Sequence, residues 1–138
     1  MAQKKIKWQV IVPDDMKNSP QTHEVSAAEI VAKHFKSVVQ FIDPLDDYKR
    51  KTPDMVMNGR VIEIKSPEGN SQKSTVRHQI DRASRQLVSE MIFDGRRTKL
   101  SDDFLRKEIL RELQKRRRIK RVIFISKTEK VLEIIKEM

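Results

Sequence analysis

The stretch that decides the fold is PDMVMNGRVIEIKSP, residues 53–67. Met55–Met57 and Arg60–Ile64 are rich in apolar and β-branched residues, which predicts two strands. Asn58-Gly59 lies between them, and this pair readily adopts the positive φ values of a type I′ turn. Ser66-Pro67 then ends the second strand. The stretch therefore predicts a tight β-hairpin.

Three charged residues of this hairpin can carry chemistry. Glu63 and Lys65 lie two positions apart in one strand, so they project from the same face. Antiparallel pairing about the turn brings Asp54 near Glu63. Two neighbouring carboxylates suit Mg²⁺ or Mn²⁺, ions that prefer oxygen ligands. Such an ion can acidify a water, and a lysine beside it can stabilise a phosphoryl transition state. The alternative is a solvated Glu–Lys pair on an exposed strand and an aspartate that only forms a turn.

Further strands and helices are predicted on both sides of the hairpin. The other strands are Lys5–Val12, Ser37–Ile42, Arg121–Ile125 and Val131–Ile135, the last with a helix as alternative. One helix begins with Ser19 as N-cap and Pro20 in its first turn and runs to Phe35; a second covers Thr75–Phe93; a third follows a cap at Ser101 and ends in Lys115–Arg118. This order predicts an α/β fold, a mixed sheet flanked by helices, in one domain over residues 1–138.

Composition narrows the class of protein. The 138 residues include no cysteine, which excludes a disulfide scaffold, thiol catalysis and Cys-ligated zinc. The three histidines form no H-x-x-x-H pair. No apolar run approaches the roughly 20 residues of a membrane-spanning helix. The net charge of +10 favours a polyanionic partner, with nucleic acid ahead of an anionic membrane.

The hairpin also resembles a known family. Pro53-Asp54 followed by Glu63-Ile64-Lys65 is similar to the signature of the PD-(D/E)xK nuclease superfamily, which has a restriction-endonuclease-like fold. The longer string TPDMVMNGRVIEIKSPEGNS and the helix after it resemble the C-terminal toxin domains of contact-dependent growth inhibition proteins, of the tRNA-nuclease type. The resemblance covers roughly Thr22 to Phe93. It implies a metal-dependent nuclease, a ribonuclease rather than a deoxyribonuclease, with tRNA as the favoured substrate.

The same resemblance implies a setting for the domain. A toxin of this type has a cognate immunity protein, because the producing cell must silence it. It would act in the cytoplasm of a target cell, and the chain would be a fragment of a larger secreted protein.

The resemblance further implies a metal site on the hairpin. Asp54 and Glu63 would be ligands of Mg²⁺ (or Mn²⁺), and the backbone carbonyl of Ile64 would be a third. Lys65 would be the catalytic lysine.

Two helices contain further candidate catalytic residues. Glu24 falls where such families place a helical glutamate that reaches the site, and a solvated first-turn glutamate is the alternative. On the helix after the hairpin, Gln86 is the favoured catalytic candidate, ahead of Gln79 and Arg82.

The chain also carries a basic segment. Residues 96–121 contain twelve Lys/Arg and four Asp/Glu, and we expect contact with nucleic-acid phosphates there, although a charge run can also be only a solvated face. Aromatic residues are scarce, which argues against base stacking. The predicted nucleic-acid-binding residues are Arg77, Arg82, Arg116, Arg117 and Arg118. The long basic third helix departs from the family pattern.

Two other functions remain open from the residues. One is a DNA nuclease of phage or repair origin that uses the same site. The other is a non-catalytic, basic nucleic-acid-binding module in which the PD…ExK pattern has no function.

Overall fold

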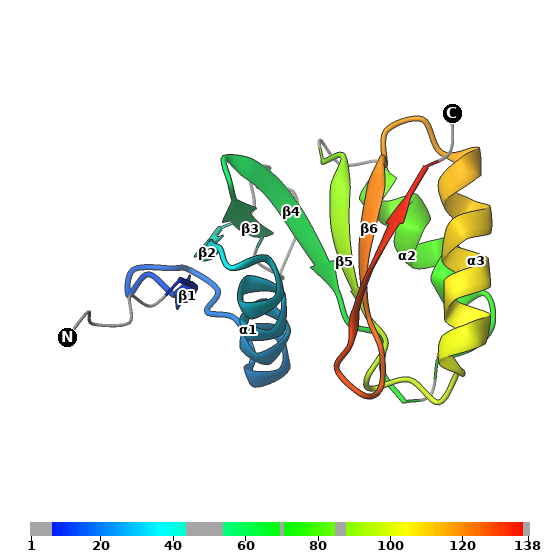
Figure 1. Cartoon of the computed structure of the whole chain (residues 1–138), viewed down its shortest axis with the longest axis horizontal. Helices are drawn as coiled ribbons and strands as arrows, with labels where there is room; N and C mark the ends of the chain where they lie inside the picture. Colours follow the sequence, from blue (N-terminus) through cyan, green and yellow to red (C-terminus); the bar gives the residue numbers. More distant parts are fainter. Residues whose placement is uncertain (1–6, 44–53, 70, 85–87, 137–138) are drawn as a thin grey trace. The chain divides into compact units, whose positions relative to one another are not determined.

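The structure, a computed structural model, describes residues 7–43, 54–69, 71–84 and 88–136. These residues form the predicted mixed α/β fold, with strands and helices in the order β1 (Gln9–Ile11), α1 (Thr22–Phe35), β2 (Val38–Ile42), β3 (Asp54–Met57), β4 (Arg60–Lys65), α2 (Thr75–Ser84), β5 (Glu90–Asp94), α3 (Asp102–Lys115), β6 (Arg121–Ile125) and β7 (Val131–Ile135) (Figure 1). None of the described helices has the length and apolar character needed to cross a membrane.

The chain divides into two compact units, Met1–Arg60 and Val61–Met138. Each has its own strands, and in each the strand order follows the chain. That the two units act as one domain stays a prediction.

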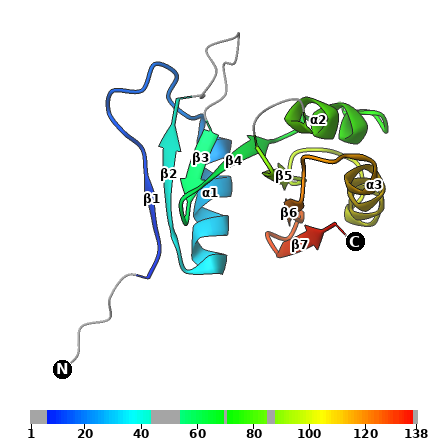
Figure 2. The ribbon, with the colours of Figure 1, turned by 90° about the horizontal axis from the view of Figure 1, so that it is seen from above.

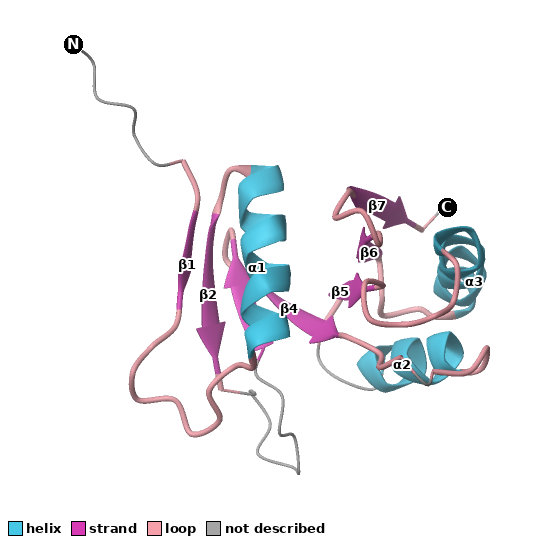
Figure 3. Cartoon of the chain, turned by 90° about the horizontal axis from the view of Figure 1, so that it is seen from below, coloured by secondary structure: helices cyan, strands magenta, loops and turns pink. Residues whose placement is uncertain are grey.

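The first unit is a strand–helix–strand motif followed by an antiparallel strand. β1 pairs parallel with β2, and β2 pairs antiparallel with β3. Helix α1 connects the two parallel strands and lies along them (Figure 3). The helix buries the small side chains of Ala27, Ala28, Val31 and Ala32. Larger side chains that alternate along β2 and β3 are buried as well, namely Val39, Phe41, Met55 and Met57.

Helix α1 begins later than the sequence suggests. Its N-cap is Gln21, not Ser19. Glu24, three residues into the helix, accepts a hydrogen bond from the backbone N–H of Gln21 at 2.8 Å. This is half of a capping box, which fixes where the helix begins, and Pro20 therefore lies before the cap.

The turn predicted at Asn58-Gly59 is confirmed. Asn58 has a φ of 52° and Gly59 a φ of 76°, and positive values at both central residues are what a type I′ turn requires. The predicted strands that flank the turn are confirmed as β3 and β4. The predictions for β2, β6 and β7 are confirmed as well, and Val131–Ile135 is a strand rather than a helix.

The second unit has four strands and two helices. β4, β5 and β6 pair parallel, and β7 pairs antiparallel with β6. Helices α2 and α3 lie side by side on one face of these strands (Figures 1 and 2). Between them and the strands is a continuous apolar core, which includes Val76, Ile80, Met91, Phe93, Leu105, Ile109, Leu113, Val122 and Phe124. The predicted cap of α3 is confirmed, because the Ser101 hydroxyl accepts from the Phe104 N–H at 3.1 Å.

The prediction of one helix over Thr75–Phe93 is wrong. Helix α2 ends at Ser84, and Glu90–Asp94 is strand β5. Every residue of β5 is buried, and the strand lies between β4 and β6. Its central residues, Met91–Phe93, are apolar in succession, and Met91 also continues the spacing of three and four residues by which Val76, Ile80, Ala83 and Leu87 predict a helix.

Candidate active site

Glu63 and Lys65 form a close ion pair on β4. The Lys65 Nζ lies 2.8 Å from the Glu63 Oε1. The two residues share a face of the strand, as their spacing predicts. The Glu63 side chain is only 1% exposed and that of Lys65 14%. The pair is therefore largely buried, and the alternative of a solvated pair on an open strand does not hold.

The Glu63 carboxylate is short of partners. Both of its oxygens are buried, and neither accepts a hydrogen bond from any residue in the described ranges. A buried carboxylate that accepts no hydrogen bond is costly, and one ammonium offsets only part of that cost. Its unused lone pairs suit a hard divalent cation. In the part of the chain that the structure describes, no group of three or more His, Asp or Glu residues is placed to hold a metal. An ion on Glu63 would therefore have at most two such side chains as ligands, and backbone carbonyls and waters would complete its coordination. Mg²⁺ is commonly bound in this way.

Ile64 can contribute only its main chain to such an ion. Its side chain is 2% exposed, and it projects from the strand face opposite to Glu63 and Lys65. Ile62, two positions earlier, is fully buried on that same face. This apolar face anchors β4 and fixes the direction in which Glu63 points.

Asp54 belongs to the first unit. It is the first residue of β3, where it pairs with Ile42 of β2, and it is 1% exposed. Met55 and Met57 alternate with it along the strand and project from the other face. Asp54 is therefore a fixed strand residue rather than part of a loose turn.

Glu24 is also buried, with 4% of its surface exposed. The alternative of a solvated first-turn glutamate is therefore wrong. Its Oε1 is engaged by the Gln21 N–H, so this carboxylate has at least a structural role at the start of α1. Acidic residues are favoured there by the helix dipole.

The candidates on α2 are divided between surface and interior. Arg77 and Arg82 are exposed, and Gln79 is half-buried. Gln86 lies outside the described residues.

The three arginines after α3 have different surroundings. Arg116 binds Asp81 of α2 at 2.8 Å and Glu112 of α3 at 3.2 Å. Arg117 and Arg118 are exposed. Arg116 therefore joins the two helices, whereas its two neighbours present their charge to solvent.

Sequence reasoning missed a buried charge cluster at the end of β5. Asp94 is fully buried and accepts from the Nε and an Nη of Arg96, each at 2.9 Å. The Ser66 hydroxyl, at the end of β4, is 3.4 Å from the same carboxylate. The hydrogen bonds to Asp94 raise the pKa of Arg96, although burial acts in the opposite direction. The sequence feature that could have revealed this cluster is Asp94, a charged residue directly after the apolar run Met91–Phe93. The sequence analysis places that run at the end of a helix.

The chain is similar to known proteins in sequence and in fold. Residues 51–131 match the family model described as the contact-dependent growth inhibition CdiA C-terminal domain. The structure is similar to one in the CdiA-CT/CdiI toxin and immunity complex from Burkholderia pseudomallei, with a TM-score of 0.58 and 18% identity, over 92% of this chain and 98% of that one. At this identity the likeness is one of fold. No curated protein matches the chain. Because the family model spans more than half of the sequence, the chain belongs to the CdiA C-terminal domain family of contact-dependent growth inhibition.

Proposed function

We propose that this domain is a metal-dependent nuclease of the PD-(D/E)xK type and the toxin effector of a contact-dependent growth inhibition system. The observation that carries the proposal is the buried Glu63 carboxylate, which has the Lys65 ammonium at 2.8 Å and accepts no hydrogen bond from the described residues. Family membership supports the toxin role. The net charge of +10 supports a polyanionic substrate.

The metal site would consist of Asp54, Glu63 and the Ile64 carbonyl, with Mg²⁺ or Mn²⁺ as the ion. The burial of both carboxylates on strands supports this set. When bound, the ion would supply an acidified water and a positive charge beside the scissile phosphate.

Lys65 would balance the charge of Glu63 and present an N–H donor to a substrate oxygen. Its side chain is 14% exposed, so a substrate phosphate could reach the ammonium with little rearrangement. Glu24 and Gln86 remain candidates for positioning the attacking water.

The favoured substrate is tRNA, as for the toxin domains that the hairpin resembles. A DNA nuclease with the same carboxylates is the second candidate, because the net charge of +10 suits either nucleic acid. In the toxin role the domain would be delivered as part of a larger secreted protein and act in the cytoplasm of a target cell.

A cognate immunity protein would be its partner. The similar solved structure is a toxin and immunity complex, and we extend that relationship to this chain. An immunity protein with an acidic binding surface would complement its charge.

Incubation with total tRNA and with plasmid DNA, each with Mg²⁺ or with EDTA, tests the function. Cleavage of tRNA alone, and only with Mg²⁺, is the expected result. Cleavage of plasmid alone would establish the second candidate. Binding of either without cleavage in Mg²⁺ would mean that the domain is a non-catalytic binding module.

A further inference from the structure

The second unit contains a positively charged groove between α2 and α3. Its volume is about 280 Å³, and its lining includes Lys73 and Arg77 from the α2 side and Arg111 and Lys115 from α3. Glu108 and Glu112 also line it. Figures 1 and 2 show the two helices side by side, so the groove follows their contact.

The cations of the groove are only partly neutralised. Arg111 lies 3.7 Å from Glu108, and Lys115 lies 3.2 Å from Glu112. Glu112 is also bound by Arg116, which lies at 3.2 Å, so its charge is already matched. The groove therefore has an excess of positive charge.

Lys73 and Arg77 have no carboxylate partner among the described residues, and both are exposed. Lys73 lies two residues before α2 and Arg77 lies in its first turn, close to the positive end of the helix dipole. An exposed cation without a carboxylate partner can bind a phosphate without first giving up an ion pair, and hydrogen bonds between such charged groups are among the strong ones. These two residues are thus free to bind an anion.

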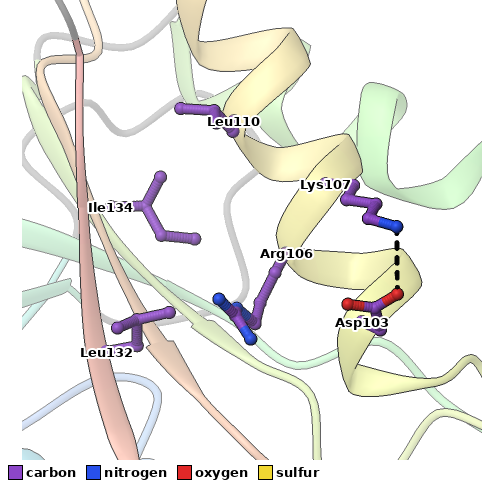
Figure 4. Close-up of a pocket in the computed structure, with 6 residues that line it drawn as sticks. All are labelled: Asp103, Arg106, Lys107, Leu110, Leu132 and Ile134. Carbon is purple, nitrogen blue, oxygen red and sulfur yellow. Dashed lines mark ion pairs between the residues drawn. The ribbon is translucent and has the colours of Figure 1, made fainter.

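The residues of α3 that line the groove form a stripe along the helix. Phe104, Glu108, Arg111 and Lys115 are spaced by four, three and four residues, so they share one side of the helix. Arg106 lies on the other side of the buried residues of α3. Figure 4 shows Arg106 beside Leu132 and Ile134 of β7, whereas Lys107 projects from the other side of α3 toward Asp103. The cations of α3 are therefore divided between two separate surfaces.

We propose that the groove between α2 and α3 binds the phosphodiester backbone of the nucleic-acid substrate. The inference rests on the proposed function and adds Lys73, Arg111 and Lys115 to the substrate-binding residues. Four flexible cations, three on the two helices and one just before α2, suit a row of phosphates. The groove has one aromatic side chain, that of Phe104, so contact would be with phosphates more than with bases, and it would be independent of sequence.

Binding of labelled total tRNA tests the inference, measured by fluorescence anisotropy over a series of salt concentrations. All proteins carry Glu63→Gln, which keeps the RNA intact. The groove variant is Arg77→Gln/Arg111→Gln. The matched control is Arg106→Gln/Lys130→Gln, which also removes two exposed positive charges, but from the side of α3 that faces β7 and from the residue before β7. Thermal melts establish that each variant is folded.

We expect the groove variant to bind about tenfold more weakly near 0.1 M salt, with a salt slope smaller by roughly 1.4, because each lost phosphate contact lowers the slope for a single strand by about 0.7. The control should change affinity less than twofold. Equal losses in the two variants, or no loss in the groove variant, would overturn the inference. Cleavage by the protein with Glu63 intact is scored separately. If the groove variant binds tRNA more weakly but the protein with Glu63 intact cuts nothing, the proposed nuclease activity is wrong and the proposed groove stands. If the protein with Glu63 intact cuts tRNA but the groove variant binds as tightly as its parent, the proposed groove is wrong and the nuclease activity stands.

Discussion

Lys65 holds its ammonium 2.8 Å from the carboxylate of Glu63, a side chain that is 1% exposed. Neither Glu63 oxygen accepts a hydrogen bond from the described residues. The charge of Glu63 thus depends on one partner in the described chain, and a bound cation would be a second. Both the stability and the proposed chemistry of the second unit depend on this relationship.

Removing the ammonium should destabilise the fold. Lys65→Met leaves the buried carboxylate without its partner, and we expect a loss of about 1–3 kcal/mol in the free energy of unfolding. Adding Glu63→Gln should recover part of that loss, because the buried charge is then gone. Urea denaturation of the two single variants and the double variant measures this coupling. Lys107→Met is the control: its pair with Asp103, at 3.1 Å, is on the surface and should contribute less than about 1 kcal/mol.

Mg²⁺ should stabilise Lys65→Met. An ion bound at Glu63 replaces the missing positive charge, so millimolar Mg²⁺ should raise the melting temperature of this variant, and it should not do so in Lys65→Met/Glu63→Gln. A ligand that binds the folded state alone stabilises it by mass action. An equal shift in both proteins would place the ion elsewhere.

Arg116 should contribute to stability, whereas Arg117 and Arg118 should contribute only to nucleic-acid binding. Arg116→Gln breaks the pairs with Asp81 and Glu112 that join α2 to α3, so the melting temperature should fall, by an amount equivalent to about 1–2 kcal/mol. Arg117→Gln/Arg118→Gln should leave the melt unchanged, because both side chains are exposed. Any effect of this pair should appear in nucleic-acid affinity. Equal melts for the two proteins would show that the Arg116 pairs contribute nothing.

Gly95 should not tolerate a side chain. A Cβ there would lie 2.8 Å from the Phe124 ring and 3.0 Å from Leu105. Gly95→Ala should therefore destabilise the second unit by about 1–3 kcal/mol through overpacking. Gly69→Ala is the matched control, since its nearest neighbour, the Arg97 carbonyl, is 3.4 Å away, and it should be nearly neutral. Chemical denaturation compares the two, and equal stability would contradict the described packing.

The sequence predicted the elements whose ends have local signals. Asn58 and Gly59 predict their turn because both residues readily adopt positive φ values. Ser101 predicts the start of α3 because its hydroxyl accepts a hydrogen bond from the first turn of that helix. β5 was missed because its central residues, Met91–Phe93, are apolar in succession and lack the alternation of a half-buried strand. The first turn of α1 was placed too early because Ser19-Pro20 is also a good cap signal, whereas the actual cap depends on the Glu24 carboxylate.

The shared strand face of Glu63 and Lys65 was predictable from the sequence, but their burial was not. The spacing of Glu63 and Lys65 placed them on one face, and the structure agrees. Their burial depends on the packing of the second unit, which no local pattern encodes. The Asp94–Arg96 pair was missed for the same reason.

The most direct test of the account is nuclease activity of the wild-type domain and Glu63→Gln, each with Mg²⁺ and with EDTA. Glutamine preserves the volume of the buried side chain and removes its charge, and a thermal melt checks that the variant is folded at the assay temperature. We predict that wild type cuts tRNA in Mg²⁺ and stops in EDTA, and that folded Glu63→Gln is at least a hundredfold slower, in line with the loss of electrostatic stabilisation of the transition state. Cleavage by Glu63→Gln at the wild-type rate, or cleavage that persists in EDTA, would contradict the account.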